Sequence, residues 1–316
     1  MASKPHAAVP LDFSHASARK RRWAGAWEFI VERIVIASGA LTVLVVLLIF
    51  AFLLKDSAPL FYRYHYPLKD LLTAHRWLPI SDPPTFGILP LLAGSLLVTV
   101  GATVLALPMG VACAAYIAEI ASPRVREFLK PTVEMLAAIP SVVLGFIGLL
   151  ILAPALKSIF HLPTGQTALA GSLMLALMAL PTVVSVAEDA ITSVPRVYRN
   201  ASLALGATPL QTIWRVTLPA ARSGIIAAVM LGVGRAVGET MTVMMITGNA
   251  GVLTGNPLRP VRTMTATIAA EMGEASHFSD HYCALFALGA MLFLITFSVN
   301  LIADVALQRG KRRGTV

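Results

Sequence analysis

Six long apolar runs constrain this chain more than any other feature of its sequence. They cover about residues 34–54, 88–118, 132–156, 166–187, 219–247 and 283–306. A helix needs about 20 apolar residues to cross the hydrocarbon core of a bilayer, and each run is long enough. Charged residues make up 13% of the chain, well below the roughly 25% of soluble domains. The sequence therefore predicts an all-α membrane protein with six transmembrane helices.

Lysine and arginine are unevenly distributed among the segments that connect these runs. They concentrate before the first run, after the second and fourth runs, and at the C-terminus. Because cytoplasmic segments carry the excess of basic residues, we expect both termini in the cytoplasm. This topology accounts for the net charge of +9, and we do not expect nucleic-acid binding. The expected parts are a cytoplasmic tail (1–33), a first helix (34–54), an extracytoplasmic loop (55–87), a five-helix core (88–306) and a basic tail (307–316).

The segment 188–224, between the fourth and fifth runs, is too long for a simple connection. Its helix-start and helix-stop residues are, in chain order, Pro195, Asn200, Gly206, Pro209 and Pro219. They predict two short helices joined at a glycine bend, the second over 210–216 and closed before the last proline. Two interpretations remain open, an interfacial helical hairpin and a docking element for a cytoplasmic partner.

The same segment contains a spaced motif. Asn200-Ala201-Ser202 is followed after three residues by Gly206, and after nine more by the run Val216 to Pro219. This spacing resembles the EAA loop of permeases of ATP-driven (ABC) importers, although Asn200 stands where that pattern has Glu and Ser202 where it has Ala. The resemblance implies a coupling helix that docks on a separate ATPase. The residues implied in coupling are Asn200, Ala201, Ser202, Leu205, Gly206, Ala207, Leu218 and Pro219.

Further motifs extend the resemblance over about residues 77–249. They are Trp77-Leu78-Pro79, Leu136 to Ser141, Leu203 to Thr208 and Gly234 to Met241. Together they resemble the PstC type of phosphate-specific ABC permease. The resemblance implies a type I importer permease (MetI-like) bundle of six helices, acting as a transport subunit and not as an enzyme. A permease for a related oxyanion and the sibling, PstA-like, subunit remain alternatives.

The resemblance also implies partners and a location. The partners are a PstA-like sibling permease in a heterodimer, a PstB-like ATPase dimer, a PstS-like extracytoplasmic phosphate-binding protein and membrane lipid. The chain lacks the Gly-rich phosphate-binding loop of nucleotide-hydrolysing proteins. We therefore expect the partner ATPase to bind ATP and Mg, and this chain to hold neither a cofactor nor a metal. The expected location is the bacterial inner membrane.

Arg235 and Glu239 lie in the middle of the fifth apolar run. Residues four apart share one face of a helix, so the two side chains are placed to pair. Ionisable residues at membrane depth are functional candidates by default. Three interpretations are open: Arg235 contacts an anion in transit while Glu239 competes for it, the pair locks two permease halves together, or Glu239 is a catalytic acid or base. The family resemblance favours the first, which makes Arg235 and Glu239 the candidate substrate-pathway residues.

Small residues flank the pair. Gly234 and Gly238 form a Gly-x-x-x-Gly arrangement, with Gly232 nearby. Such stripes allow helices to approach closely in lipid, so they predict a helix that faces protein, with the charges inside the bundle.

An intramembrane enzyme is the alternative from a different functional class. The chain has neither Gly-x-Ser-x-Gly nor His-Glu-x-x-His, and no histidine lies within an expected span. These absences disfavour an enzyme. Outside the spans, His277 and His281 would share a helix face, which suits either a metal site or a solvated segment near the entrance; we favour the solvated segment.

Overall fold

The computed structural model describes the backbone of residues 14–313 and the side chains of residues 28–302, 304 and 305. Residues 1–13 and 314–316, which belong to the two expected tails, lie outside the described residues. The long helices are α1 (Ser14–Tyr62), α3 (Leu89–Ala115), α4 (Pro123–Ala137), α7 (Ala168–Thr192), α11 (Arg222–Gly238) and α14 (Asp280–Arg313). The short ones are α2 (Leu68–Thr73), α5 (Ser141–Ile147), α6 (Ala153–Ile159), α8 (Arg196–Ala204), α9 (Pro209–Thr212), α10 (Leu218–Ala220), α12 (Met241–Ile246) and α13 (Met264–Glu271). Three π-helical turns, η1 (Tyr116–Ile120), η2 (Gly148–Leu152) and η3 (Ile213–Thr217), and two strands, β1 (Trp77–Leu78) and β2 (Thr85–Phe86), complete the fold.

The helices are apolar enough for a multi-pass membrane protein. Within the described residues five helical segments could each cross a membrane, and a sixth results when a pair bent by 72°, Pro209–Ala220 and Arg222–Gly238, is taken as one span. The predicted helical class and number of spans are thus confirmed. The chain divides into two units, 1–52 and 53–316. The first unit contains most of α1, whose side chains from Ile34 to Ile49 are all exposed, as a lipid-facing helix requires.

The predicted third span, 132–156, is wrong at its start. Its first residues belong to α4, which ends at Ala137 and has no buried residue. The chain then breaks before Pro140, and the candidate span runs from Ser141 to Ile159. The break has a local cause, because proline disfavours helical geometry in the residue before it and cannot donate a backbone hydrogen bond.

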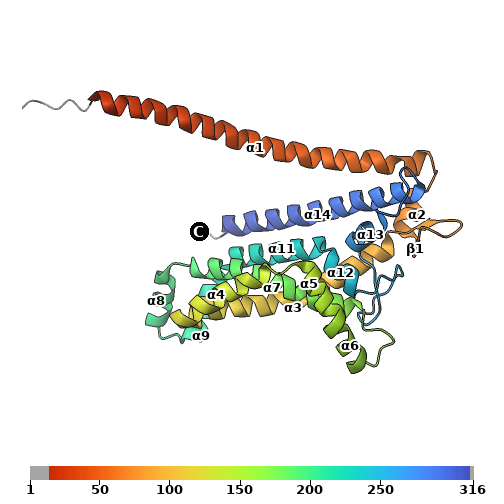
Figure 1. Ribbon diagram of the computed structural model, residues 1–316. Coiled ribbons are helices and arrows are strands. Elements are labelled where there is room, and N and C mark those ends of the chain that lie inside the picture. The colour runs from red at the N-terminus through yellow and green to blue at the C-terminus, as the bar shows by residue number, and fades with distance from the viewer. Residues whose placement is uncertain (1–13, 314–316) are drawn as a thin grey trace, which may run out of the picture. The chain divides into compact units, whose positions relative to one another are not determined.

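Helices α3, α4, α7 and α11 lie side by side in the second unit (Figure 1). Small residues allow α3 and α7 to pack closely. A Cβ added at Gly101 would lie 2.4 Å from Ser172 Oγ, and one added at Gly110 would lie 2.7 Å from Val183 Cγ1. Lipid gives no hydrophobic drive for helix association, so this close van der Waals packing is what joins the two helices.

The second unit has two structurally distinct ends (Figure 1). At the α8 end, α8 and α9 project beyond the long helices. At the opposite, hairpin end, the strands β1 and β2 pair antiparallel, with Trp77 opposite Phe86. Both aromatic rings are buried there, in a core that also includes Leu60, Met264 and Leu285. This core joins the segment before α3 to α13 and α14.

Candidate functional site

The fifth apolar run is broken next to its charged residues. α11 ends at Gly238, Glu239 has extended backbone (ψ 131°), and α12 starts at Met241. Two hydrogen bonds hold the break. Thr242 N donates to Glu239 Oε1 (3.1 Å), and Thr265 Oγ1 donates to the Glu239 carbonyl (2.8 Å). The carboxylate of Glu239 thus satisfies a backbone N–H in the first turn of α12.

The predicted pairing of Arg235 with Glu239 along one helix face is therefore wrong. The break takes Glu239 out of the helical register, and the described residues include no ion pair between the two within 4.0 Å. Arg235 is exposed, and its Nη1 donates instead to Thr182 Oγ1 on α7 (3.3 Å). Both charged residues still line one small depression, together with Met178. They remain neighbours without neutralising each other.

Gly234 and Gly238 are not closely packed within the described residues, so their predicted role in helix packing stays a prediction. Both are exposed; a Cβ at Gly238 would meet nothing within 4 Å, and one at Gly234 only Asn300 Oδ1 at 3.9 Å. Gly232 is the packed glycine, because a Cβ there would lie 2.6 Å from Val183 Cγ2 on α7. Gly234, Arg235 and Gly238 are all exposed, so this part of α11 is not covered by the described residues.

We expect Gly232→Ala to lower the free energy of unfolding of the isolated chain in detergent by about 1–3 kcal/mol, because the added methyl overpacks the α7–α11 contact. Gly234→Ala is the matched control: it makes the same change inside α11, and its added methyl meets only Asn300 Oδ1 at an ordinary contact distance of 3.9 Å. Thermal unfolding of both variants measures the difference. Equal stability of the two variants would contradict the packing assigned to Gly232.

The segment 188–224 forms two helical pieces at the α8 end. α8 follows Pro195, as predicted, whereas Asn200 lies inside α8 instead of starting it. Gly206 has φ +87°, a conformation that residues with a Cβ rarely adopt, and this makes the bend. Thr208 and Gln211 then form a reciprocal capping box on α9.

The second piece is longer than predicted. It continues without a stop through η3 and α10, past Pro219, and bends by 72° before α11. Pro219 directly follows the π-helical turn η3, where the regular hydrogen-bond ladder of an α-helix is already interrupted, so its missing N–H costs little. Large apolar side chains of the segment are exposed, including Val197 (75%), Leu205 (90%), Leu210 (60%) and Trp214 (67%). Exposed apolar side chains of this kind are compatible with both interpretations of the segment, an interfacial hairpin and a docking element.

The residues predicted to couple to an ATPase lie in this segment. Six of them run from α8 through the bend: Asn200, Ala201, Ser202, Leu205, Gly206 and Ala207. Leu218 and Pro219 lie in α10, after the second helical piece. One side-chain bond joins the two pieces, between Ser202 Oγ and Thr212 Oγ1 (2.9 Å).

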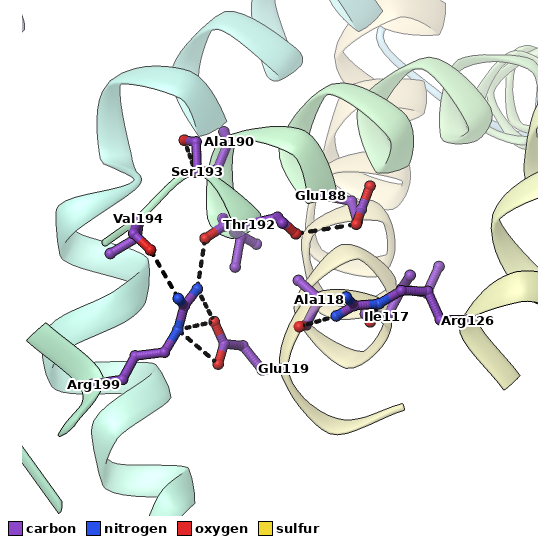
Figure 2. A network of polar contacts seen from close by, with 11 residues as sticks. Ile117, Ala118, Glu119, Arg126, Glu188, Ala190, Thr192, Ser193, Val194 and Arg199 are labelled. Carbon is purple, nitrogen blue, oxygen red and sulfur yellow. Dashed lines mark hydrogen bonds and ion pairs between the residues drawn. The ribbon is translucent and has the colours of Figure 1, made fainter. Parts of the chain in front are cut away.

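A network of polar contacts anchors the segment to the long helices (Figure 2). Arg199 of α8 forms an ion pair with Glu119 in η1 (2.6 Å), and their side chains are only 17% and 11% exposed. Arg126 at the start of α4 donates to the carbonyls of Ile117 and Ala118, which closes the turn after α3. Carbonyls at helix ends lack intrahelical partners, so these contacts satisfy groups that would otherwise be orphaned.

Lys130 of α4 bridges two carboxylates near the end of α7. Its Nζ lies 2.6 Å from Glu188 Oε2 and 2.8 Å from Asp189 Oδ1. Hydrogen bonds to Asp189 and Glu188 hold the pKa of Lys130 well above its ordinary value. The lysine is thus charged throughout the physiological pH range. Stability from a raised lysine pKa is lost only when the pH rises above the ordinary value, near 10.4, so these bridges persist at neutral pH.

A second polar cluster centres on Glu271 at the hairpin end. Its carboxylate accepts from Trp77 Nε1 (2.8 Å) and from Arg262 Nη1 (2.5 Å), and it contacts His281 Nε2 (2.9 Å). Arg262 also donates to the Asn249 carbonyl (3.0 Å). His281 is therefore part of a mostly buried cluster, while His277 is exposed and lies against Tyr282. The predicted joint face of the two histidines is not formed, and the described residues contain no group suited to hold a metal ion.

Sequence reasoning missed Glu119 and the role of Arg199, and it placed Glu271 in an outer polar segment without identifying its partners Trp77 and Arg262. Arg199 and Lys130 counted only as basic residues that set the topology, because a charge at a helix end gives no sign of its distant partner. The one usable signal was Glu119 itself, an acidic residue at the end of an apolar run beside a basic segment. It indicated an interfacial ion pair but did not identify Arg199, 80 residues further along the chain.

Comparison with known proteins gives consistent results. The family described as "Binding-protein-dependent transport system inner membrane component" matches residues 106–312. A probable ABC transporter permease of Bacillus subtilis, YqgH, is 38% identical over 77% of this chain and 78% of its own length. The phosphate transport system permease PstC of Mesorhizobium japonicum is 35% identical over 76% and 78%.

A structure of the MetNI methionine ABC transporter shares the fold. It has a TM-score of 0.53 and 21% identity, over 71% of this chain and 94% of that chain. At this identity the likeness concerns architecture alone, and it confirms the MetI-like arrangement predicted from the sequence.

Proposed function

Because this chain belongs to the family of binding-protein-dependent transport system inner membrane components, we propose that it is the permease subunit of an ATP-driven importer of inorganic phosphate. Family membership makes it a multi-pass inner-membrane protein that works with an ATPase and a substrate-binding protein, and not an enzyme. Phosphate as the substrate is supported by the relatives named as phosphate permeases, which are 31–35% identical over most of the chain.

The observation that carries the proposal is the exposed guanidinium of Arg235 within an apolar helix. Among the described residues it makes one side-chain hydrogen bond, the 3.3 Å bond to Thr182, so donors remain for a ligand. A guanidinium presents a planar fork of N–H groups that matches the oxygens of phosphate. The cost of placing this charge at membrane depth favours a role in substrate passage.

In this proposal Glu239 does not compete with phosphate by pairing with Arg235, which is the role expected from its position four residues along the helix. Its carboxylate holds the start of α12, and it lines the same depression as Arg235. A negative charge beside the arginine repels a bound anion, which would keep phosphate from binding too tightly for release. In this mechanism the break between α11 and α12 shapes the pathway, and alternating access exposes Arg235 to one side of the membrane at a time.

The proposed assembly contains four kinds of subunit. A PstA-like sibling would cover the exposed face of α11 and complete the pathway as a heterodimer. A PstB-like ATPase dimer would bind ATP and Mg and receive the exposed apolar side chains of the 188–224 segment. A PstS-like protein would deliver phosphate at the hairpin end. Both termini would then be cytoplasmic.

The substrate is tested by uptake of radiolabelled phosphate into vesicles that hold the assembled complex, ATP and the phosphate-binding protein. Unlabelled phosphate and sulfate are added as competitors. We expect phosphate to compete and sulfate at equal concentration to have little effect. Uptake that sulfate abolishes would instead favour a permease for a related oxyanion.

The glycine bend in the segment 188–224, called here the docking segment, gives a second prediction. Gly206→Val places a β-branched residue at φ +87°, which costs about 1–2 kcal/mol and displaces the exposed Leu205. We expect less ATPase to co-purify with the tagged permease. Gly206→Asn is the matched control, because asparagine tolerates this conformation better. Full retention of the ATPase by the valine variant would contradict a docking role for the bend.

A further inference from the structure

Every nitrogen of the Arg199 guanidinium donates to an acceptor. Its Nε donates to both carboxylate oxygens of Glu119 (2.8 and 3.1 Å). Its Nη1 donates to the Val194 carbonyl (2.8 Å), and its Nη2 donates to the Ile191 carbonyl (2.8 Å) (Figure 2). All three guanidinium nitrogens therefore have acceptors, and the contact is mostly shielded from water. Charge-assisted, bidentate contacts of this kind fix geometry as well as contributing energy.

These acceptors belong to different elements. Glu119 lies in the turn that ends α3, Ile191 in the last turn of α7, and Val194 in the three-residue link between α7 and α8. Within α8, all of which the structure describes, no other side chain hydrogen-bonds to α3 or α7, and none of its residues is buried. Without Arg199, α8 would be held by its link to α7, in which Val194 is buried, and by the Ser202–Thr212 bond to α9, but it would have no side-chain bond to α3. With it, α8 is fixed to both long helices.

The two long helices, α3 and α7, are closely packed along their length. Ser172 Oγ of α7 donates to the Val98 carbonyl of α3 (3.2 Å), and the glycine contacts of the pair leave no space for sliding. Thr182, the partner of Arg235, lies nine residues before Ile191, which corresponds to about 14 Å along α7. A displacement of α8 is thus transmitted to Thr182 and Arg235 through α7, which is a continuous helix packed against α3.

We propose that the Arg199–Glu119 contact, called here the α8 joint, converts movement of the docking segment into movement of α3 and α7. Arg199 and Glu119 are then positioning residues for energy coupling. The inference rests on the proposed function, because it assumes that the ATPase pulls on α8. A contact that served only to hold the fold together would affect assembly and leave the coupling ratio intact.

The test uses the assembled complex in vesicles with binding protein, and measures ATP hydrolysed and phosphate taken up in the same sample. Arg199→Lys keeps the charge but replaces the fork by a single point charge. Glu119→Gln keeps the shape but removes the charge. We expect the phosphate transported per ATP to fall about fivefold or more in both. Arg196→Lys, an exposed substitution on the same helix, is the control and should keep the wild-type ratio.

If uptake and hydrolysis fall in parallel, so that the ratio is unchanged, the α8 joint is only structural and the inference is overturned. If Arg199→Lys does not assemble, the ratio of Glu119→Gln decides in the same way. A wild-type complex that hydrolyses ATP without taking up phosphate would refute the proposed substrate instead.

A second readout does not depend on the substrate. Spin labels at Arg196 on α8 and Val104 on α3, both exposed, report the distance between the two helices in the complex with and without ATP. Cys113 and Cys283 are replaced beforehand, so that only the introduced sites are labelled. We expect one narrow distribution in the wild type and a broad one in Arg199→Lys. Equal widths would contradict the α8 joint even in a transporter for another anion.

Discussion

Replacing Arg235 with alanine is expected to lower phosphate uptake by about 10- to 100-fold, the loss that follows when a charge-assisted hydrogen bond worth roughly 1.5–3 kcal/mol is removed. Its guanidinium is exposed on α11 and bonded only weakly to Thr182. Uptake into vesicles with ATP and binding protein measures the effect. The amount of assembled complex is determined alongside, so that lost transport is not confused with lost assembly.

Arg235→Lys tests whether transport needs only a positive charge at this position or also the planar fork of guanidinium N–H donors. Lysine keeps a positive charge at the same position but offers a single ammonium group, so we expect partial activity. Thr182→Val removes the hydroxyl that accepts from Arg235 and should reduce uptake less than the alanine variant. If Arg235→Lys assembled normally and transported at the full rate, the fork of donors would be unnecessary and the anion-contact role would be wrong.

Glu271→Ala is expected to lower the free energy of unfolding by about 3 kcal/mol, because it leaves the charge of Arg262 without its partner in a mostly buried cluster. Trp77 Nε1 and His281 lose their acceptor at the same time. Denaturant unfolding in mixed micelles measures the change. The effect is structural and should appear in the isolated chain.

Glu274→Ala is the matched control for this cluster. Glu274 lies three residues further along the chain and is exposed, so its removal should change stability by less than about 0.5 kcal/mol. Glu271→Gln should lie between the two, since an amide still accepts hydrogen bonds. Equal stability of the Glu271→Ala and Glu274→Ala variants would contradict the assignment of Glu271 as the centre of the cluster.

Hydropathy predicted the helical class because every spanning segment must satisfy its own backbone in lipid. It did not predict where the helices break. The apolar runs continue through Pro140 and through Glu239, so composition indicates one helix where the structure has two. At Glu239 the break depends on a bond from Thr265, which is distant in sequence. Helical spacing alone therefore placed Arg235 and Glu239 on one face that the fold does not form.

The docking segment was predictable in outline because proline, glycine and a capping threonine act locally. Pro195, Gly206 and Pro209 each mark the boundary that their chemistry predicts. The partners of Arg199 were not predictable, because a contact between α3, α7 and α8 depends on how the long helices pack. The exposure of Gly238 likewise depends on which face of α11 this chain leaves free.

The central claim is that this chain forms part of the path of an ATP-driven phosphate importer. Its most direct test is accumulation of labelled phosphate in vesicles that contain the ATPase, the sibling permease and the binding protein, with and without this chain. We predict accumulation against a concentration gradient only when both this chain and ATP are present. Accumulation without the chain, or none with the complete complex and ATP, would contradict the account.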